Sequence, residues 1–375
     1  TQRNRKFVDT ARYFEDYDLD PQNHSVLIVS RGKSFTMGNW EGAITQHGKP
    51  DGIRYRLTRW LRDGLRLICV SDENGEEFLE IHYVDEQKPP EKLEGLDIGR
   101  PVSLDVSPKE DLVILTNHRF ELLLVDLKSK NVTLLDRSSY ARVSGVSWSP
   151  DGKWVAYGLA CTQQTSSIKI CQIDSRNIYQ VTKPILRDIN PSFDPDGKFL
   201  YFLSYRDFSP VYDNLHFDLG FPRGMRPFLI TLQAGQRSPF IAEPKPLVEP
   251  EENKEENSCK EDENVDQMVE QHDGQEQRKK EGDQLVQIDL EGIMDRVVAF
   301  PVSEGRYGQI VGIKNKVYFT VFPIPGSEDK SRLEMYDLEK HEKETISSDV
   351  SSFKVSSDYK ILAYRSADKL RIIKA

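Results

Sequence analysis

The chain repeats one arrangement of hydrophobic and polar positions. Each unit has a tight polar turn, then a run that is apolar on both faces, then a strand in which apolar and polar residues alternate. Runs such as Val26–Val29, Leu112–Leu115 and Phe199–Leu203 predict strands that are covered on both sides, whereas Ile168–Asp174 predicts a strand covered on one side. Because burial decreases outward from the second strand, each unit is expected to be a small sheet of about four strands.

The polar turns give the period of the repeat. Ser149–Lys153 and Asp194–Lys198 share a Pro-Asp-Gly-Lys phrase, in which Pro presets φ and Gly accepts positive φ. Looser copies lie near residues 21, 63, 108, 315 and 358, so successive turns are 42–45 residues apart except between residues 195 and 315. This period predicts seven units.

Seven four-stranded units at this interval predict an all-β fold, a seven-bladed β-propeller of antiparallel blades with a disordered acidic insertion. The period-two pattern excludes a helical solenoid, and two consecutive β-sandwiches would not require one turn phrase at an even interval. We expect blades at about 12–48, 53–90, 99–137, 143–183, 188–244, 286–346 and 350–375. The last repeat stops after its third strand, and residues 5–10 are the candidate for the missing fourth one. The polar start without Met leads us to expect a segment of a longer protein.

Charge is concentrated in one segment. The chain has a formal net charge of −10, and residues 249–284 hold an acidic excess with almost no apolar side chains, which predicts a disordered loop. An acidic docking segment for a basic partner is the alternative. The remainder is nearly neutral, so no nucleic-acid partner is expected. The sequence shows no secretory leader and no apolar run that could cross a bilayer, which favours a cytoplasmic protein without a membrane role.

Candidate chemistry is sparse. The four cysteines form no Cys-x-x-Cys pair, although Cys161 and Cys171 could approach each other across a hairpin, and no motif predicts a metal site, a cofactor or a catalytic nucleophile. Asp194–Gly197 resembles the start of a calcium loop but lacks the later glutamate, so we interpret it as a turn. The histidines are scattered and are expected at the surface: His24, His47, His82, His118, His216, His272 and His341.

One pattern could carry binding. Four repeats place an arginine just after the buried second strand, and the first strand of the second repeat adds two more; the set is Arg31, Arg119, Arg206, Arg365, Arg54 and Arg56. All second-to-third hairpins of a propeller emerge on one face, so these side chains could form a partial collar that attracts a carboxylate, such as a peptide C-terminus. The alternative is that hairpins carry charge for solubility, which Asp72 and Glu73 at the same place in the second repeat favour.

Several phrases resemble a known family. Phe7–Asp16, Leu27–Gly32, Asn117–Glu121, Trp154–Gly158 and Leu200–Arg206 are similar to the second, seven-bladed propeller of the tricorn protease family, particularly its bacterial members. The resemblance covers the chain except for the acidic loop, whose length and charge depart from the family.

The resemblance implies a cytoplasmic serine peptidase that trims oligopeptides and assembles as a hexamer. In that family a smaller propeller precedes this one, and PDZ-like and catalytic modules follow it. The catalytic serine, histidine, supporting serine and glutamate lie in those modules, and none maps onto this chain. The resemblance therefore implies a domain without catalytic residues whose channel leads peptides to an active site elsewhere, in a ring that no strand exchange closes. The alternative functional interpretation is a non-enzymatic scaffold of the WD or Tol type.

Overall fold

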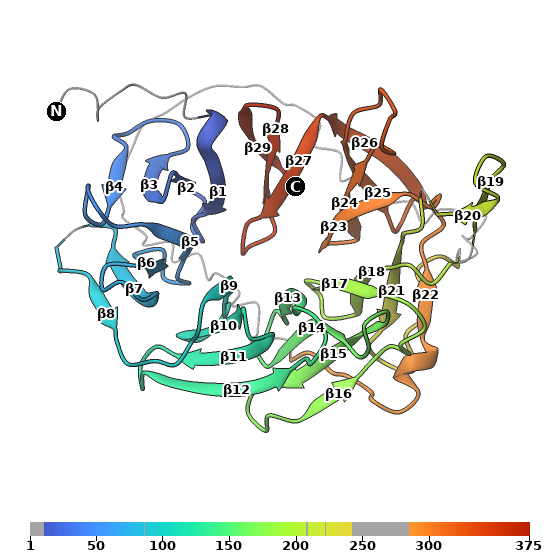
Figure 1. Ribbon diagram of the computed structural model, residues 1–375, viewed down its shortest axis with the longest axis horizontal. Helices are drawn as coiled ribbons and strands as arrows, with labels where there is room; N and C mark the ends of the chain where they lie inside the picture. The colour runs from blue at the N-terminus through green and yellow to red at the C-terminus, as the bar shows by residue number, and fades with distance from the viewer. Residues whose placement is uncertain (1–10, 86, 208, 222, 242–284) are drawn as a thin grey trace, which may run out of the picture.

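Seven antiparallel sheets surround a central axis in the computed structural model (Figure 1). The structure describes residues 11–85, 87–207, 209–221, 223–241 and 285–375. This arrangement confirms the predicted all-β, seven-bladed propeller. A short 3-10 helix, η2 (Ala11–Tyr13), precedes the first strand, and a second one, η3 (Ile293–Asp295), lies in the fifth blade. No helix in the described ranges is long and apolar enough to cross a bilayer.

The first four blades each contain four consecutive strands. Their bounds are β1 (Phe14–Leu19), β2 (Ser25–Ser30), β3 (Lys33–Gly38) and β4 (Thr45–His47); β5 (Tyr55–Trp60), β6 (Arg66–Ser71), β7 (Phe78–Tyr83) and β8 (Glu91–Leu93); β9 (Pro101–Val106), β10 (Leu112–Asn117), β11 (Glu121–Asp126) and β12 (Asn131–Arg137); β13 (Ser144–Trp148), β14 (Trp154–Ala160), β15 (Ser166–Gln172) and β16 (Ile178–Gln180).

The fifth blade differs from the expected boundary. It contains β17 (Asp188–Phe193), β18 (Phe199–Ser204), β21 (Arg226–Thr231) and β22 (Val297–Ala299), so its fourth strand follows the acidic segment. Residues 286–305, which we assigned to the sixth blade, therefore belong with the fifth. The sequence pattern did not reveal this strand because β22 has only three residues and pairs with β21 across a long insertion. Most of that insertion, including the predicted disordered loop at 249–284, lies outside the described residues.

The last two blades complete the ring. The sixth contains β23 (Arg306–Ile313), β24 (Lys316–Phe322), β25 (Arg332–Asp337) and β26 (Glu342–Ser348). The seventh contains β27 (Val350–Val355), β28 (Ile361–Ser366) and β29 (Lys369–Lys374), which pair as a three-stranded sheet. Residues 5–10, the candidate for a fourth strand here, lie outside the described ranges. A separate hairpin, β19 (Val211–Asp213) and β20 (Asp218–Gly220), is inserted between β18 and β21.

The core is divided among the seven junctions between blades. Each apolar cluster joins two neighbouring sheets, as when Leu79 and Ile81 of the second blade pack with Leu104 and Leu123 of the third. The smallest cluster joins the first two blades through Leu27, Trp60 and Leu67. Burial of the second strands on both faces follows from this packing and confirms the interpretation of their apolar runs.

Polar contacts supplement the small cluster between the first two blades. Ser34 Oγ lies 2.7 Å from Thr58 Oγ1 across this junction, and both side chains are buried. His47 and His82 are also buried, with 3% and 4% exposed, so the expectation of surface histidines is wrong for these two. Burial lowers the pKa of His82 to about 4, which keeps its imidazole neutral near neutral pH.

The innermost strand of every blade contains an irregularity. The pairing register shifts within β1, β5, β9, β13, β17, β23 and β27 where each meets its second strand. A β-bulge bends the strand and increases its twist, so these shifts curve the seven inner strands around the axis. Three of them use a positive φ, at Leu57, Gly145 and Asn190.

The predicted turns form as expected. Gly152 and Gly197 have φ of 71° and 68°, and their N–H groups donate to the carbonyls of Ser149 and Asp194. No disulfide forms in the described part of the chain: Cys161 and Cys171 are both thiols at opposite ends of the β14–β15 hairpin.

Candidate functional site: the axial cavity

A cavity of about 630 Å³ lies on the axis of the ring. All seven blades contribute to its wall through their inner strands and the turns that follow. Figure 1 shows the seven inner strands arranged around the axis. The wall is therefore built from the edge strands that leave backbone groups facing the axis. Such a lining can hydrogen-bond an extended chain without reading its side chains.

One position of the inner strand gives a ring of side chains around this cavity. The seven residues are Asp18, Arg59, Asp105, Ser147, Ser192, Val311 and Lys354, one from each blade. Blades seven, one, two and three provide the charged members, and blades four, five and six provide two serines and a valine. The cavity therefore has a charged half and a neutral half.

The charged half is a network that crosses blade junctions. Arg59 Nη1 donates to Asp16 Oδ2 at 2.6 Å, and Lys354 Nζ lies 3.3 Å from Asp16 Oδ1 and 3.7 Å from Asp18 Oδ1. Burial opposes ionisation of Asp16, but the charges of Lys354 and Arg59 outweigh it and lower its pKa. These two cations thus link the seventh, first and second blades at the axis.

Main-chain bonds fix neighbouring inner strands to each other. The Trp60 N–H donates to Asp18 Oδ2 at 3.0 Å, the Phe193 N–H to Ser147 Oγ at 3.0 Å, and the Phe353 N–H to Gln309 Oε1 at 3.0 Å. In each pair the acceptor belongs to the preceding blade. Polar side chains of the lining therefore also set the positions of the next inner strand.

Asp105 stands apart within the charged half. No ion pair or hydrogen bond to its carboxylate occurs among the described residues, and its main-chain carbonyl accepts a bond from Trp148 Nε1 at 3.3 Å. Burial raises the pKa of Asp105 to about 6, although Arg59 and Lys354 act against this change. Its carboxylate lines the cavity and can meet a cationic or amide group of a bound chain.

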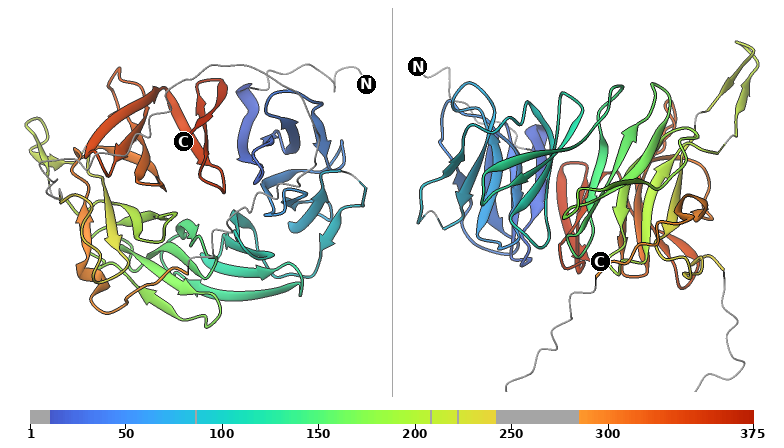
Figure 2. Two further views of the ribbon diagram at one scale, coloured as in Figure 1. Left: turned by 180° about the vertical axis from the view of Figure 1, so that it is seen from behind. Right: turned by 90° about the horizontal axis from the view of Figure 1, so that it is seen from below.

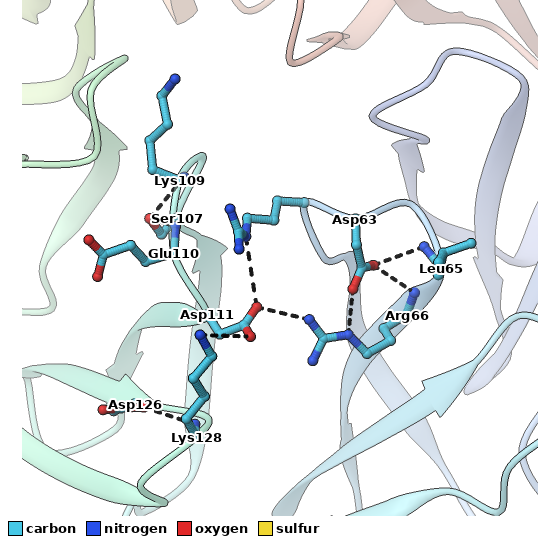
Figure 3. A network of polar contacts seen from close by, with 10 residues as sticks. Asp63, Leu65, Arg66, Ser107, Lys109, Glu110, Asp111, Asp126 and Lys128 are labelled. Atoms are coloured by element: carbon cyan, nitrogen blue, oxygen red, sulfur yellow. Dashed lines mark hydrogen bonds and ion pairs between the residues drawn. The ribbon is translucent and has the colours of Figure 1, made fainter. Parts of the chain in front are cut away.

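A second network borders the cavity on the face that carries the turns after the inner strands (Figure 3). Asp111 Oδ1 accepts from Arg66 Nη2 at 2.9 Å and lies 3.9 Å from Arg62 Nε, while Lys128 Nζ is 3.7 Å from Asp111 Oδ2. Arg62 is also part of the cavity wall. Asp63 also pairs with Arg66 at 2.5 Å, so the cations of this network are balanced by nearby carboxylates.

The six predicted arginines all lie on the opposite face, where the inner strands begin. Three of them bind acids: Arg56 pairs with Glu77, Arg119 with Asp97 and Glu121, and Arg206 with Asp188, as the salt bridges record. These pairs give the three arginines structural roles within their own blades.

The other three make different contacts. The Arg31 guanidinium lies 4.9 Å from the centre of the Tyr13 ring and that of Arg365 lies 4.8 Å from the Phe14 ring. The Arg54 N–H donates to Asp72 Oδ1 at 2.7 Å, and its side chain packs beside Gly32. Arg31 and Arg54 are exposed and have no ion-pair partner within the described ranges.

Sequence reasoning missed the charged lining of the cavity. The available signal was a polar or charged residue two positions before the turn that follows each inner strand, at Asp18, Arg59, Asp105 and Lys354. Three aspartates at the ends of third strands cap the turns that follow: Asp85, Asp126 and Asp337 each accept an N–H bond from the residue two positions later. The corresponding Asp174 pairs with Lys153. In the described part of the chain, no group of three His, Cys, Asp or Glu residues could hold a metal ion.

Comparison with known proteins gives a consistent result. Residues 14–375 match the family described as the tricorn protease second beta propeller domain. A tricorn protease homolog of Saccharolobus solfataricus is 34% identical over 98% of this chain and 31% of its own length. Tricorn protease homolog 1 of Streptomyces coelicolor is 30% identical over 98% of this chain and 34% of its own.

The solved structures agree on the fold. The crystal structure of the tricorn protease superimposes with a TM-score of 0.77 at 21% identity, over 97% of this chain and 33% of that one. The chain thus spans about a third of the length of these relatives.

Proposed function

This chain belongs to the family of tricorn protease second β-propeller domains, and we propose that it serves as the substrate-access channel of a peptidase. The observation that carries the proposal is the axial cavity, which is lined by the inner strands of all seven blades. An extended peptide is narrow enough to follow such an axis, and exposed backbone groups along the wall offer it sequence-independent hydrogen bonds. The active site would lie outside this segment.

The electrostatic asymmetry of the lining supports passage in a preferred orientation. Asp18 and Asp105 provide carboxylates to one half of the cavity, and Arg59 and Lys354, which both pair with Asp16, provide cations beside them. A peptide carries opposite charges at its two ends, so its termini experience different attractions as they pass this half. The neutral half offers small side chains that leave space for those of the substrate.

The arginines of the opposite face contribute to capture in this proposal. Arg31 and Arg54 are exposed near the junction of the first two blades, and both can attract the carboxylate of an incoming peptide. Arg56, Arg119 and Arg206 hold local structure, and the carboxylates paired with them balance their charges. Arg365 lies over the Phe14 ring on the same face. Loss of affinity for an acidic peptide after Arg31→Ala with Arg54→Ala would support capture, and unchanged affinity would remove it.

From the family we also propose four features of the parent protein. It cleaves oligopeptides by a serine-type mechanism, lies in the cytoplasm, carries catalytic and PDZ-like modules in the same polypeptide, and assembles into a hexamer.

The channel is tested in the intact protein by narrowing the cavity. Val311→Trp places an indole in the neutral half without removing any ion pair. We expect kcat/KM to fall several-fold for a peptide of about ten residues, which is about 30 Å long when extended, and to stay unchanged for a dipeptide reporter. Leu134→Trp on the outer strand β12, where Leu134 is 54% exposed, is the control. Equal effects on both substrates, or none, would contradict the proposal.

A further inference from the structure

The β19–β20 hairpin extends away from the ring (Figure 2). It leaves the fifth blade between β18 and β21 and pairs as its own two-stranded sheet, with Tyr212 opposite Leu219 and Asp213 opposite Asp218. An isolated two-stranded hairpin is marginally stable in water unless something covers one of its faces. A partner that covers one face would therefore stabilise this hairpin.

The two faces of the hairpin differ. Tyr212 and Leu219 are directly opposite in the register and share an apolar face, whereas Asp213 and Asp218 share the other face with Val211. The tip of the hairpin adds Leu215 and Phe217. The exposed fractions are 54% for Tyr212, 78% for Leu215, 78% for Phe217 and 48% for Leu219.

Polar contacts pre-organise the tip. Asp213 Oδ1 accepts from the Leu215 N–H at 2.8 Å and from the His216 N–H at 3.3 Å, and Asp213 Oδ2 lies 2.7 Å from His216 Nδ1. At the base of the arm, Arg226 Nε lies 3.0 Å from Asp207 Oδ2, without the alignment of a hydrogen bond. The turn therefore holds the apolar side chains of Leu215 and Phe217 on a backbone whose conformation is fixed by hydrogen bonds. Such pre-organisation reduces the entropy cost of binding a partner.

We propose that the β19–β20 hairpin is a docking arm for an apolar surface on another domain of the same polypeptide, outside residues 1–375. Its four apolar side chains expose on the order of 500 Å², the size of the largest functional patches on monomers. A stable interface between independent proteins buries about 800 Å² per partner, so this arm is small for a freely diffusing partner. A covalently linked domain needs less contact area because its effective concentration is high.

Two further observations favour a linked domain over a second copy of this propeller. This chain covers 31% and 34% of the length of two relatives. About two thirds of each relative therefore lies outside the matched region and could supply the apolar surface for the arm. The hollow on the same chain at His118–Phe120 and Arg137–Ser139 has two arginines and two serines, so it suits an apolar arm poorly.

Photo-crosslinking in the intact protein tests the proposal. p-Benzoylphenylalanine replaces Phe217 in an equal mixture of isotopically light and heavy protein, and the crosslinked peptides are identified by mass spectrometry. We expect pure light and pure heavy adducts that join residue 217 to residues beyond this chain. Mixed adducts, adducts within residues 1–375, or no adducts would each overturn the proposal. The same label at Leu134 is the control, since this side chain is also exposed, at 54%, on the outer strand β12.

Proteolysis provides a second measurement. Leu215→Ser with Leu219→Ser removes half of the apolar face but keeps Tyr212 and Phe217 as chymotrypsin sites. If the arm is docked, the variant of the intact protein is cleaved there about tenfold faster than the parent, because weaker docking exposes the arm more often. Leu134→Ser with Ile185→Ser leaves this rate unchanged. Equal cleavage of parent and double hairpin variant would overturn the proposal, and the unchanged melting temperature of the blades shows that the variant is folded.

Discussion

Arg59 donates to Asp16 at 2.6 Å across the junction between the first two blades. The bond matters because the apolar cluster at this junction is the smallest of the ring. Arg59 also lies among three carboxylates, those of Asp16, Asp18 and Asp105, and these act together to raise its pKa against the effect of burial. The guanidinium therefore balances the acidic side of the axial cavity.

Replacing Arg59 should destabilise the ring. Arg59→Met leaves Lys354 as the nearest cation to Asp16 and should lower the free energy of unfolding by about 2–3 kcal/mol at pH 7, since removing one partner of a largely buried pair leaves an uncompensated charge. Urea denaturation measures the change. Arg62→Met is the control: Arg62 is 46% exposed and 3.9 Å from Asp111, so its loss should cost less than about 0.5 kcal/mol. Equal losses for the two variants would contradict this role of Arg59.

Asp105 should make the protein more stable when it is neutral. Its pKa of about 6 lies above the value of an unfolded aspartate, so between about pH 4 and pH 6 the folded state binds more protons at this group. Ionisation therefore costs stability as the pH rises through 6. Asp105→Asn should raise the free energy of unfolding by about 1–2 kcal/mol at pH 7 and leave it unchanged near pH 4.

Asp126→Asn is a control for which the expected change in stability has the opposite sign. Burial favours the neutral carboxyl of Asp126, but N–H bonds from Ser129 and Lys128 outweigh burial and lower its pKa. The ionised form of Asp126 therefore stabilises the folded state at pH 7, and Asp126→Asn should lower the free energy of unfolding there. Urea denaturation at both pH values separates the two cases. A gain for Asp105→Asn that is the same at pH 4 and pH 7 would show that charge is not its cause.

Gly145 should tolerate no side chain in the bulge of β13. Its φ is +67°, and a Cβ atom there would lie 2.7 Å from the Cα atom of Asn190 in the next inner strand. Gly292 has a φ of +66° with no atom within 4 Å of the same position. Gly292→Ala should thus cost about 1 kcal/mol from backbone strain alone, and Gly145→Ala about 2 kcal/mol more from the clash. Equal melting temperatures for the two variants would exclude the clash.

Arg206 should contribute mainly to the stability of the fifth blade. Its guanidinium lies 5.4 Å from the ring centres of Phe202 and Phe228, and Nη2 donates to Asp188 Oδ2 at 2.5 Å. The Asp188 side chain is 1% exposed, so Arg206→Met strands a buried carboxylate and should cost about 3 kcal/mol.

Two further variants test this explanation. Asp188→Asn in the Arg206→Met background should recover part of the loss, because it removes the stranded charge. Lys183→Met should cost under about 1 kcal/mol, since Lys183 is 57% exposed and its partner Asp295 is 71% exposed. Denaturation curves that show no recovery in the double variant would assign the loss to ring stacking instead.

The sequence was informative where the fold depends on local signals. The repeated turn phrase at Ser149–Lys153 and Asp194–Lys198 fixed the period, and the apolar runs located the second strands. Both signals depend only on residues close together in the chain, because a turn needs Pro and Gly at set positions and a covered strand needs apolar residues on both faces.

The features that the sequence did not reveal depend on distant contacts. β22 pairs with β21 across the insertion, so Val297–Ala299 carries no mark of its blade. The charged residues of the axial cavity are in short, half-polar strands, and their meeting requires the ring to close. The burial of His47 and His82 likewise depends on packing at the polar junction of the first two blades, which no spacing predicts.

The position of β22 has a consequence for the order of assembly. In the other four-stranded blades the fourth strand follows the third after a short connection, whereas in the fifth blade it must wait for residues 232–296 to be made and brought back. Each doubling of such a connection adds about 0.6 kcal/mol to the entropy cost of closing it. During synthesis the fifth blade would therefore still lack its outer strand after the four blades before it are complete, and it would be finished only shortly before the sixth blade begins to emerge.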